Sequence, residues 1–257
     1  MYKRQELARP PAWRYWRQLP PKGRIGIFFG NWYSQMLQGR VHGDLKKDQL
    51  NGAIEGALGL EQMLCNEGTL IFKFWFHLSK KQMLARLESL KDDPLHSWRL
   101  SPLDWQQSKT YDKFVRAGED VLRRTSRDYA PWYIVAGADA NYRSLTVGRI
   151  LLEGLQAVLR GSAERAPLPH ATPLMTRTDQ RSLLDSLDMR LSLAKADYRA
   201  QLVREQARLA QLMRDKRMRR HALVAVFEGN DAAGKGGAIR RVAAALDPRQ
   251  YLSLIHI

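Results

Sequence analysis

The sequence has a single cysteine, Cys65, among its 257 residues. One cysteine excludes an intramolecular disulfide framework and a cysteine-based zinc site, and it is typical of a reducing compartment. Long hydrophobic runs are also lacking, because the longest, residues 70–78 and 222–227, are strand-sized and far shorter than the roughly 18 residues of a membrane helix. No apolar segment of the signal-peptide kind follows the first basic residues. We therefore expect a cytoplasmic protein with no membrane partner.

Acidic residues are scarce relative to basic ones. The chain has 26 Asp and Glu against 42 Lys and Arg, which gives a formal net charge of +16. A field of this sign concentrates polyanions such as nucleic acid, anionic lipid or polyphosphate at the surface. Charge alone does not choose among them, and a solvated basic surface without a dedicated ligand is the alternative.

Apolar strand-like runs alternate with helical periodicity in the first two thirds of the chain. This alternation predicts an α/β fold with a parallel sheet flanked by helices. The predicted strands are 24–29, 69–76 and 131–136, and the predicted helices are 47–65, 79–91, 103–124 and 141–159. Residues 161–180 have the proline-rich composition of a linker. The spacing of apolar residues from Leu184 to Leu212 then predicts one long helix.

The segment 222–246 carries the motif with the most defined chemistry. It has the pattern of a buried strand, a glycine-rich turn and a helix, and it satisfies the spacing G-x-x-x-x-G-K of a phosphate-binding loop. Glycines let backbone amides approach phosphate oxygens, and the helix N-terminus and the lysine add positive charge. A tight turn that binds nothing is the alternative. The predicted phosphate-binding residues are Gly229, Asn230, Ala232, Ala233, Gly234, Lys235, Gly236 and Gly237.

One residue departs from the usual loop. Gly236 replaces the serine or threonine that normally follows the lysine and holds Mg²⁺. A phosphotransferase still needs the metal, so another oxygen ligand has to serve. We predict Asp231 as the Mg²⁺ ligand, and Asp231 with Lys235 as the catalytic residues. The alternative role for Asp231 is a turn aspartate that caps a neighbouring amide.

The stretch from Phe227 to Gly237, FEGNDAAGKGG, resembles the signature of the polyphosphate kinase 2 family. The resemblance implies a P-loop kinase fold, a three-layer arrangement of parallel sheet and flanking helices with a helical lid. It implies Mg²⁺ as cofactor and transfer of phosphoryl groups between inorganic polyphosphate and nucleotides. It also implies that Asp231 binds the metal and that Lys235 contacts the reacting phosphates.

The resemblance covers most of the chain, in two pieces. Residues 6–160 are similar to the C-terminal part of such a domain, residues 161–180 join the pieces, and residues 181–251 are similar to the N-terminal part of another. This order implies two incomplete copies and an internal piece of a two-domain family member that acts on AMP. Residues 252–257 match nothing in the family, and we expect a non-native end.

The first copy departs from the family pattern at its site. The segment PPKGRIGIFFGNWY, residues 20–33, is similar to a short strand followed by F-D-R-S-W-Y, but Gly30 and Asn31 replace the Walker B-like aspartate and the arginine after it. Neither replacement supplies the lost charge, so we expect the first copy to be degenerate.

The predicted function is phosphoryl transfer from polyphosphate to a nucleotide, AMP to ADP, by the full-length enzyme. We expect this chain alone to be inactive, nucleic acid to be the less favoured partner, and a homo-oligomer to be compatible with the sequence. An ATP-dependent P-loop kinase of a small acceptor stays open, as does a basic polyanion-binding module with a vestigial loop. A further hypothesis is that the first piece, which lacks a P-loop strand, accepts residues 222–227 in that gap of its sheet.

Overall fold

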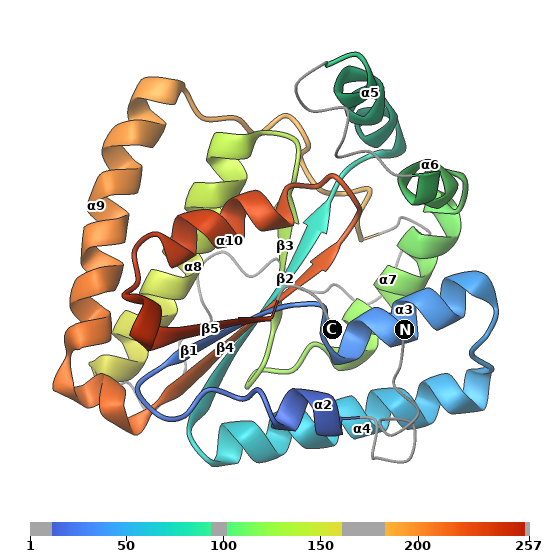
Figure 1. Cartoon of the computed structure of the whole chain (residues 1–257). Coiled ribbons are helices and arrows are strands. Elements are labelled where there is room, and N and C mark those ends of the chain that lie inside the picture. Colours follow the sequence, from blue (N-terminus) through green and yellow to red (C-terminus); the bar gives the residue numbers. More distant parts are fainter. Residues whose placement is uncertain (1–11, 94–101, 161–182, 255–257) are drawn as a thin grey trace.

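The structure, a computed structural model, describes residues 12–93, 102–160 and 183–254. These residues form one five-stranded sheet in the order β3-β2-β4-β1-β5, with every neighbouring pair parallel (Figure 1). The strands are β1 (Ile25–Phe29), β2 (Thr69–His77), β3 (Trp132–Ala136), β4 (Ala222–Gly229) and β5 (Tyr251–Leu254). The predicted α/β fold with a parallel sheet is thereby confirmed.

Strand β4 occupies the centre of the sheet, between two strands that are far from it in sequence. Its residue Phe227 is in register with Phe29 of β1 and with Phe74 of β2. All eight residues of β4 are buried, because helices cover both faces of the sheet. The structure thus confirms the hypothesis that residues 222–227 fill a gap in the sheet of the first piece. Both pieces contribute to a single sheet, and β5, which includes residues 252–254, extends it beside β1.

Two helical layers sandwich the sheet. One face is covered by α2 (Trp13–Trp16), α3 (Trp32–His42), α4 (Lys47–Asn66) and α7 (Tyr111–Thr125). The other face is covered by α8 (Ala140–Leu159), α9 (Lys195–Arg214) and α10 (Lys235–Ala243). Helices α5 (Lys80–Lys91) and α6 (Pro102–Lys109) lie beyond the carboxyl ends of β2 and β4 (Figure 1). Short 3₁₀ helices η2 (Lys216–Arg220) and η3 (Pro248–Gln250) precede β4 and β5.

The prediction of one long helix from Leu184 to Leu212 is wrong, because α9 begins only at Lys195. Leu184 is buried in the layer of α3, α4 and α7, and its amide donates to Glu119 Oε1 at 3.0 Å. The chain must cross from this layer to the opposite face before α9 can start. The periodicity therefore joined two apolar segments that pack in different cores.

The predicted helix 103–124 is two helices, α6 and α7, separated at Thr110. Both the amide and the hydroxyl of Thr110 donate to the carbonyl of Gln107, at 3.1 Å each, which closes a turn. Helix α3 was not predicted. The predicted linker 161–180 lies outside the described residues, and no helix in the described ranges is long and apolar enough to cross a membrane.

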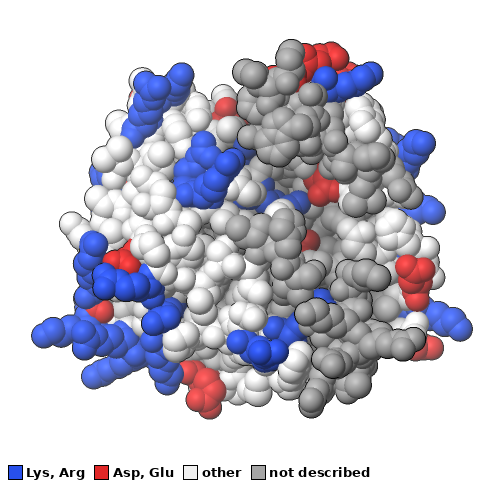
Figure 2. All heavy atoms as spheres, in the orientation of Figure 1, with Lys and Arg blue, Asp and Glu red and all other residues white. Residues whose placement is uncertain are grey.

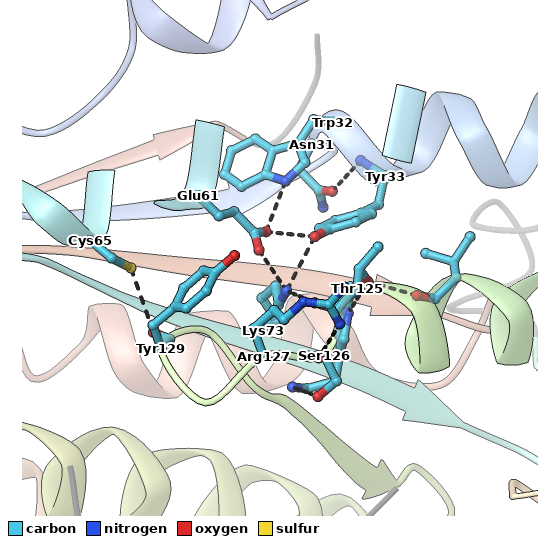
Figure 3. Close-up of polar contacts among 12 residues, drawn as sticks. Asn31, Trp32, Tyr33, Glu61, Cys65, Lys73, Thr125, Ser126, Arg127 and Tyr129 are labelled. Carbon is cyan, nitrogen blue, oxygen red and sulfur yellow. Dashed lines mark hydrogen bonds and ion pairs between the residues drawn. The ribbon is translucent and has the colours of Figure 1, made fainter. Parts of the chain in front are cut away.

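A charged network lies inside the layer of α3, α4 and α7 (Figure 3). Lys73 of β2 is fully buried, and its Nζ donates to Glu61 Oε2 of α4 at 2.7 Å and to the carbonyl of Thr125 at 2.8 Å. The other carboxylate oxygen accepts from Tyr33 Oη at 2.6 Å and Trp32 Nε1 at 3.1 Å. Burial lowers the pKa of Lys73, and Glu61 opposes this shift. The network ties three helices to one strand.

Candidate phosphate-binding site

The loop between β4 and α10 has the strand-turn-helix form that the motif predicts. The turn starts at Gly229, whose φ is 125°, and an added Cβ there would lie 2.0 Å from the carbonyl oxygen of Phe76. It ends at Gly234, the N-cap of α10 with φ 88°, where a Cβ would lie 2.1 Å from the Arg143 guanidinium. Both residues must be glycine, because positive φ and close packing each exclude a side chain.

The backbone amides of this turn divide into two groups. Those of Asn230, Ala233 and Gly237 already donate to carbonyl oxygens, of Phe76, Asn230 and Gly234 respectively. Those of Ala232, Gly234, Lys235 and Gly236 donate to no other residue that the structure describes. Ala232 has φ 58°, a left-handed backbone conformation that is uncommon outside glycine. Together with the N-terminus of α10, these amides make a cup suited to an anion.

Lys235 is turned toward the interior of the loop. Its Nζ donates to the carbonyls of Gly229 and Asn230 at 2.7 and 2.8 Å, and the ammonium lies 5.7 Å from the ring centre of Phe29. Burial lowers its pKa, while the carboxylates of Asp231 and Glu228 oppose the shift. The ammonium therefore already has acceptors in the loop, and it would have to exchange them for phosphate oxygens to contact a ligand.

Asp231 lies on the open side of the loop. Its side chain is 41% exposed, and Oδ1 is 3.9 Å from Lys235 Nζ. With Asn230 it borders a small cleft with a volume of about 40 Å³. Other residues that line this cleft include Gln38, His42, Thr110 and Tyr111. The predicted metal ligand is thus reachable from solvent at the edge of this small cleft.

Residues at the end of β1 and the start of α3, in the segment similar to F-D-R-S-W-Y, meet the base of the loop. Asn31 caps α3, and its Nδ2 donates to Glu228 Oε1 at 2.9 Å. Ser34 donates to the same oxygen, and burial raises the pKa of Glu228. Counted back from Trp32 and Tyr33, the aspartate and the arginine of F-D-R-S-W-Y fall on Phe29 and Gly30, and Asn31 takes the place of the serine, so the assignment of Gly30 and Asn31 to the aspartate and the arginine is one residue too late. The ring of Phe29 lies against Lys235. This end of β1 therefore offers the loop an amide and a ring, and no carboxylate.

The charged residues near the loop permit only a limited metal site. In the described part of the chain, no three His, Cys, Asp or Glu residues are grouped so that they could hold a metal ion. Glu228 is buried and already accepts from Asn31 and Ser34. Mg²⁺ commonly uses one or two carboxylates and takes its other ligands from water and substrate phosphates. The exposed carboxylate of Asp231 fits a metal held in that way.

Two arginines that the sequence analysis did not identify support the loop from other helices. Arg86 of α5 donates through Nη2 to the carbonyl of Ala138 at 2.7 Å and through Nη1 to that of Ala232. Arg143 of α8 donates through Nη1 to the carbonyl of Gly137 at 2.8 Å. An isolated arginine in a helix has no distinguishing spacing, so only the tertiary structure reveals these contacts.

Basic side chains are also spread over the surface, as Figure 2 shows for one face. They gather near the C-terminal end of α9 and along η2, where the sequence is RDKRMRR from residue 214 to residue 220. Arg217 there is paired with Asp215 at 2.7 Å and caps the C-terminal carbonyl of α8 at Leu159, so part of this charge is structural.

The parallel sheet and the glycine-rich turn that joins β4 to α10 define a P-loop α/β protein. A family model described as polyphosphate kinase 2 matches residues 3–161 and 192–254. The chain belongs to the polyphosphate kinase 2 family, which confirms the resemblance.

Named relatives agree with this membership. The chain is 72% identical over 247 residues to a polyphosphate:AMP phosphotransferase of Pseudomonas syringae pv. tomato, covering 96% of this chain and 50% of that protein. It is 67% identical, with the same coverage, to a polyphosphate:AMP phosphotransferase of Pseudomonas aeruginosa. A crystal structure of a putative polyphosphate kinase 2 from Pseudomonas aeruginosa PA01 has a TM-score of 0.51 and 59% identity, covering 98% of this chain and 47% of that one. The chain therefore spans about half the length of these relatives.

Proposed function

We propose that the chain is part of a phosphotransferase that moves a phosphoryl group from inorganic polyphosphate to AMP, giving ADP. The geometry that supports this most is the turn from Gly229 to Gly237, in which four amides without described acceptors surround the N-terminus of α10. A cup of this kind binds phosphate. The relatives that share up to 72% of the sequence are named for this reaction.

The proposed division of labour follows from the placement of the loop residues. The amides of the turn hold the oxygens of the transferred phosphoryl group, and Lys235 moves its ammonium from the Gly229 and Asn230 carbonyls to these oxygens as charge develops. Asp231 holds Mg²⁺, the divalent cation that we propose for this kinase family, and the metal when bound neutralises phosphate charge. The acceptor nucleotide approaches from the side of the loop on which Asp231 is exposed.

We further propose that residues 6–160 and 181–251 are parts of two successive domains, joined by 161–180, whereas the family match through residue 254 does not support a non-native end that begins at 252. The interruption of the family match between residues 161 and 192 supports two pieces. The ring of Phe29 lies against Lys235 where the motif has an aspartate, and Gly30 stands where it has an arginine, which supports a degenerate first copy and an inactive chain on its own. The cytoplasmic location and a homo-oligomeric state stay predictions.

The experiment compares variants in a full-length protein that contains this segment. With Asp231→Asn or Lys235→Ala, we expect ADP formation from AMP and polyphosphate to fall by at least ~10²-fold, because each change removes one charged contact to the transition state. Asp197→Asn and Lys195→Ala, on the exposed first turn of α9, are matched controls that should retain the rate. Wild-type rates in both loop variants would refute the proposal.

Two alternatives make different predictions in the same experiment. An ATP-dependent kinase of a small acceptor would use ATP in preference to polyphosphate as donor. A polyanion-binding module with a vestigial loop would show salt-sensitive binding that Lys235→Ala leaves unchanged. Because the net charge of +16 also suits a polyanion-binding module, the experiment includes the binding measurement.

A further inference from the structure

Guanidinium groups from three helices converge on one side of the loop. Arg143 of α8 and Arg241 of α10 point at the same place, because Nη2 of Arg143 and Nη1 of Arg241 lie 3.7 and 3.6 Å from where a Cβ on Gly237 would be. Burial, and then the charges of Arg86 and Arg241, lower the pKa of Arg143 to about 10. The carboxylate that opposes this shift, Asp139, already accepts from the amide of Tyr142. Positive charge here exceeds negative charge.

Arg143 has hydrogen-bonding capacity that the described residues leave unused. It is only 9% exposed, yet its buried Nε has no hydrogen-bond partner in the described part of the chain. Its guanidinium lies against Gly234 and reaches the first turn of α10, where the amides of Lys235 and Gly236 also lack described acceptors. Buried polar groups of a folded protein normally have partners, so an unpaired donor beside a helix N-terminus points to a bound anion.

The three arginines differ in what they can offer. Arg86 donates to the carbonyls of Ala232, Gly137 and Ala138, so it serves the loop itself. Arg241 uses Nε for Tyr198 Oη and Nη1 for the carbonyl of Gly237. Its Nη2, like that of Arg143, donates to no other residue that is described. Arg143 and Arg241 are therefore the two with donors to spare.

We propose that Arg143 and Arg241, beside the N-terminus of α10, form a second oxyanion site for a neighbouring phosphoryl unit of a condensed phosphate chain. This inference rests on the proposed function, in which the cup of the loop holds the first unit. A guanidinium group can donate two parallel hydrogen bonds to phosphate oxygens. Because Arg143 and Arg241 bind the unit next to the one held in the loop, the two sites together favour a chain of phosphates over a single phosphate. The affinity of this site for condensed phosphate therefore depends on the length of the phosphate chain.

The test measures binding of orthophosphate, pyrophosphate and tripolyphosphate to this chain by calorimetry at fixed salt. We expect the wild type to bind tripolyphosphate more tightly than orthophosphate. Arg143→Gln or Arg241→Gln should lower tripolyphosphate affinity by about tenfold or more, because a hydrogen bond to a charged group is lost, and should change orthophosphate affinity by about twofold at most. The matched control is Arg240→Gln, which removes the same charge from an exposed neighbour on α10 and should change neither affinity by more than about twofold.

A further variant guards against a folding defect at the buried Arg143. Gly237→Ala places a methyl group where the two guanidinium groups converge, at ordinary contact distances and in helical backbone, so the variant should fold. It should also lose the preference for tripolyphosphate. The inference is overturned if that preference survives these three variants, if Arg240→Gln removes it equally, or if the wild type binds none of the phosphates. The proposed function fails by a different result, undiminished transfer in Asp231→Asn and Lys235→Ala.

Discussion

Replacing Glu61 by glutamine would leave the ammonium of Lys73 buried without its counter-charge. Lys73 Nζ would keep the carbonyl of Thr125 and the hydroxyl of Tyr33, at 2.8 and 3.2 Å, as acceptors (Figure 3). Neither carries a full charge, and the pKa of Lys73, already lowered by burial, would fall further. The protein can then avoid a buried charge only by releasing the proton from Lys73.

The free energy of releasing this proton sets an upper limit on how much stability the variant loses. At pH 7 a lysine with an ordinary pKa near 10.4 must lose about three and a half pKa units, and each unit corresponds to about 1.4 kcal/mol. We therefore expect Glu61→Gln to lower the free energy of unfolding by about 3–5 kcal/mol, as is usual when one partner of a buried ion pair is removed. Lys73→Met should be less destabilising, because Glu61 keeps Tyr33 and Trp32 as donors.

The assay is urea denaturation followed by tryptophan fluorescence, with a double-mutant cycle. The variant with both Glu61→Met and Lys73→Met should unfold within about 2 kcal/mol of the wild type, since neither buried charge remains. Glu55→Gln, exposed on the same helix, is the matched control and should change stability by less than about 0.5 kcal/mol. A loss below about 1 kcal/mol in Glu61→Gln, or a double variant less stable than both single ones, would refute the reasoning.

Two further predictions concern residues beside the loop. Burial lowers the pKa of His77 to about 4, so the folded state binds fewer protons than the unfolded one between about pH 4 and 6.5, and stability should fall by about 3 kcal/mol as the pH drops through that range. Denaturation at several pH values checks this, and a His77→Gln variant with the same slope would contradict it. Gly229→Ala should lower the free energy of unfolding by more than about 3 kcal/mol, because the new Cβ would collide with the Phe76 carbonyl and φ at this position is 125°. Gly52→Ala, in open space on α4, is the control and should leave stability unchanged or raise it. Equal changes of melting temperature in the two variants would contradict the prediction for Gly229.

Local pattern was enough to predict the turn from Gly229 to Gly237 and the strands on which the fold is built. A buried strand, glycines at fixed spacing and a lysine are neighbours in the chain, so their chemistry is visible without a fold. The same holds for β1, β2 and β3, which the structure places within a residue or so of the predicted ranges. Adjacent residues also show that Gly236 replaces the usual serine or threonine and that Asp231 is a candidate Mg²⁺ ligand.

Contacts between distant segments were decided only by the tertiary structure. The sequence allows the insertion of β4 between β1 and β2 only as a hypothesis, because strand pairing depends on which sheet edges are open in the folded protein. Periodicity could not show that Leu184 packs on the face opposite α9. Arg143, Arg86 and Arg241 come from three helices and meet only because the sheet brings those helices to one end of β4. Sequence thus determined which residues could bind phosphate, and packing decided which charges surround them, since charge acts through space and not along the chain.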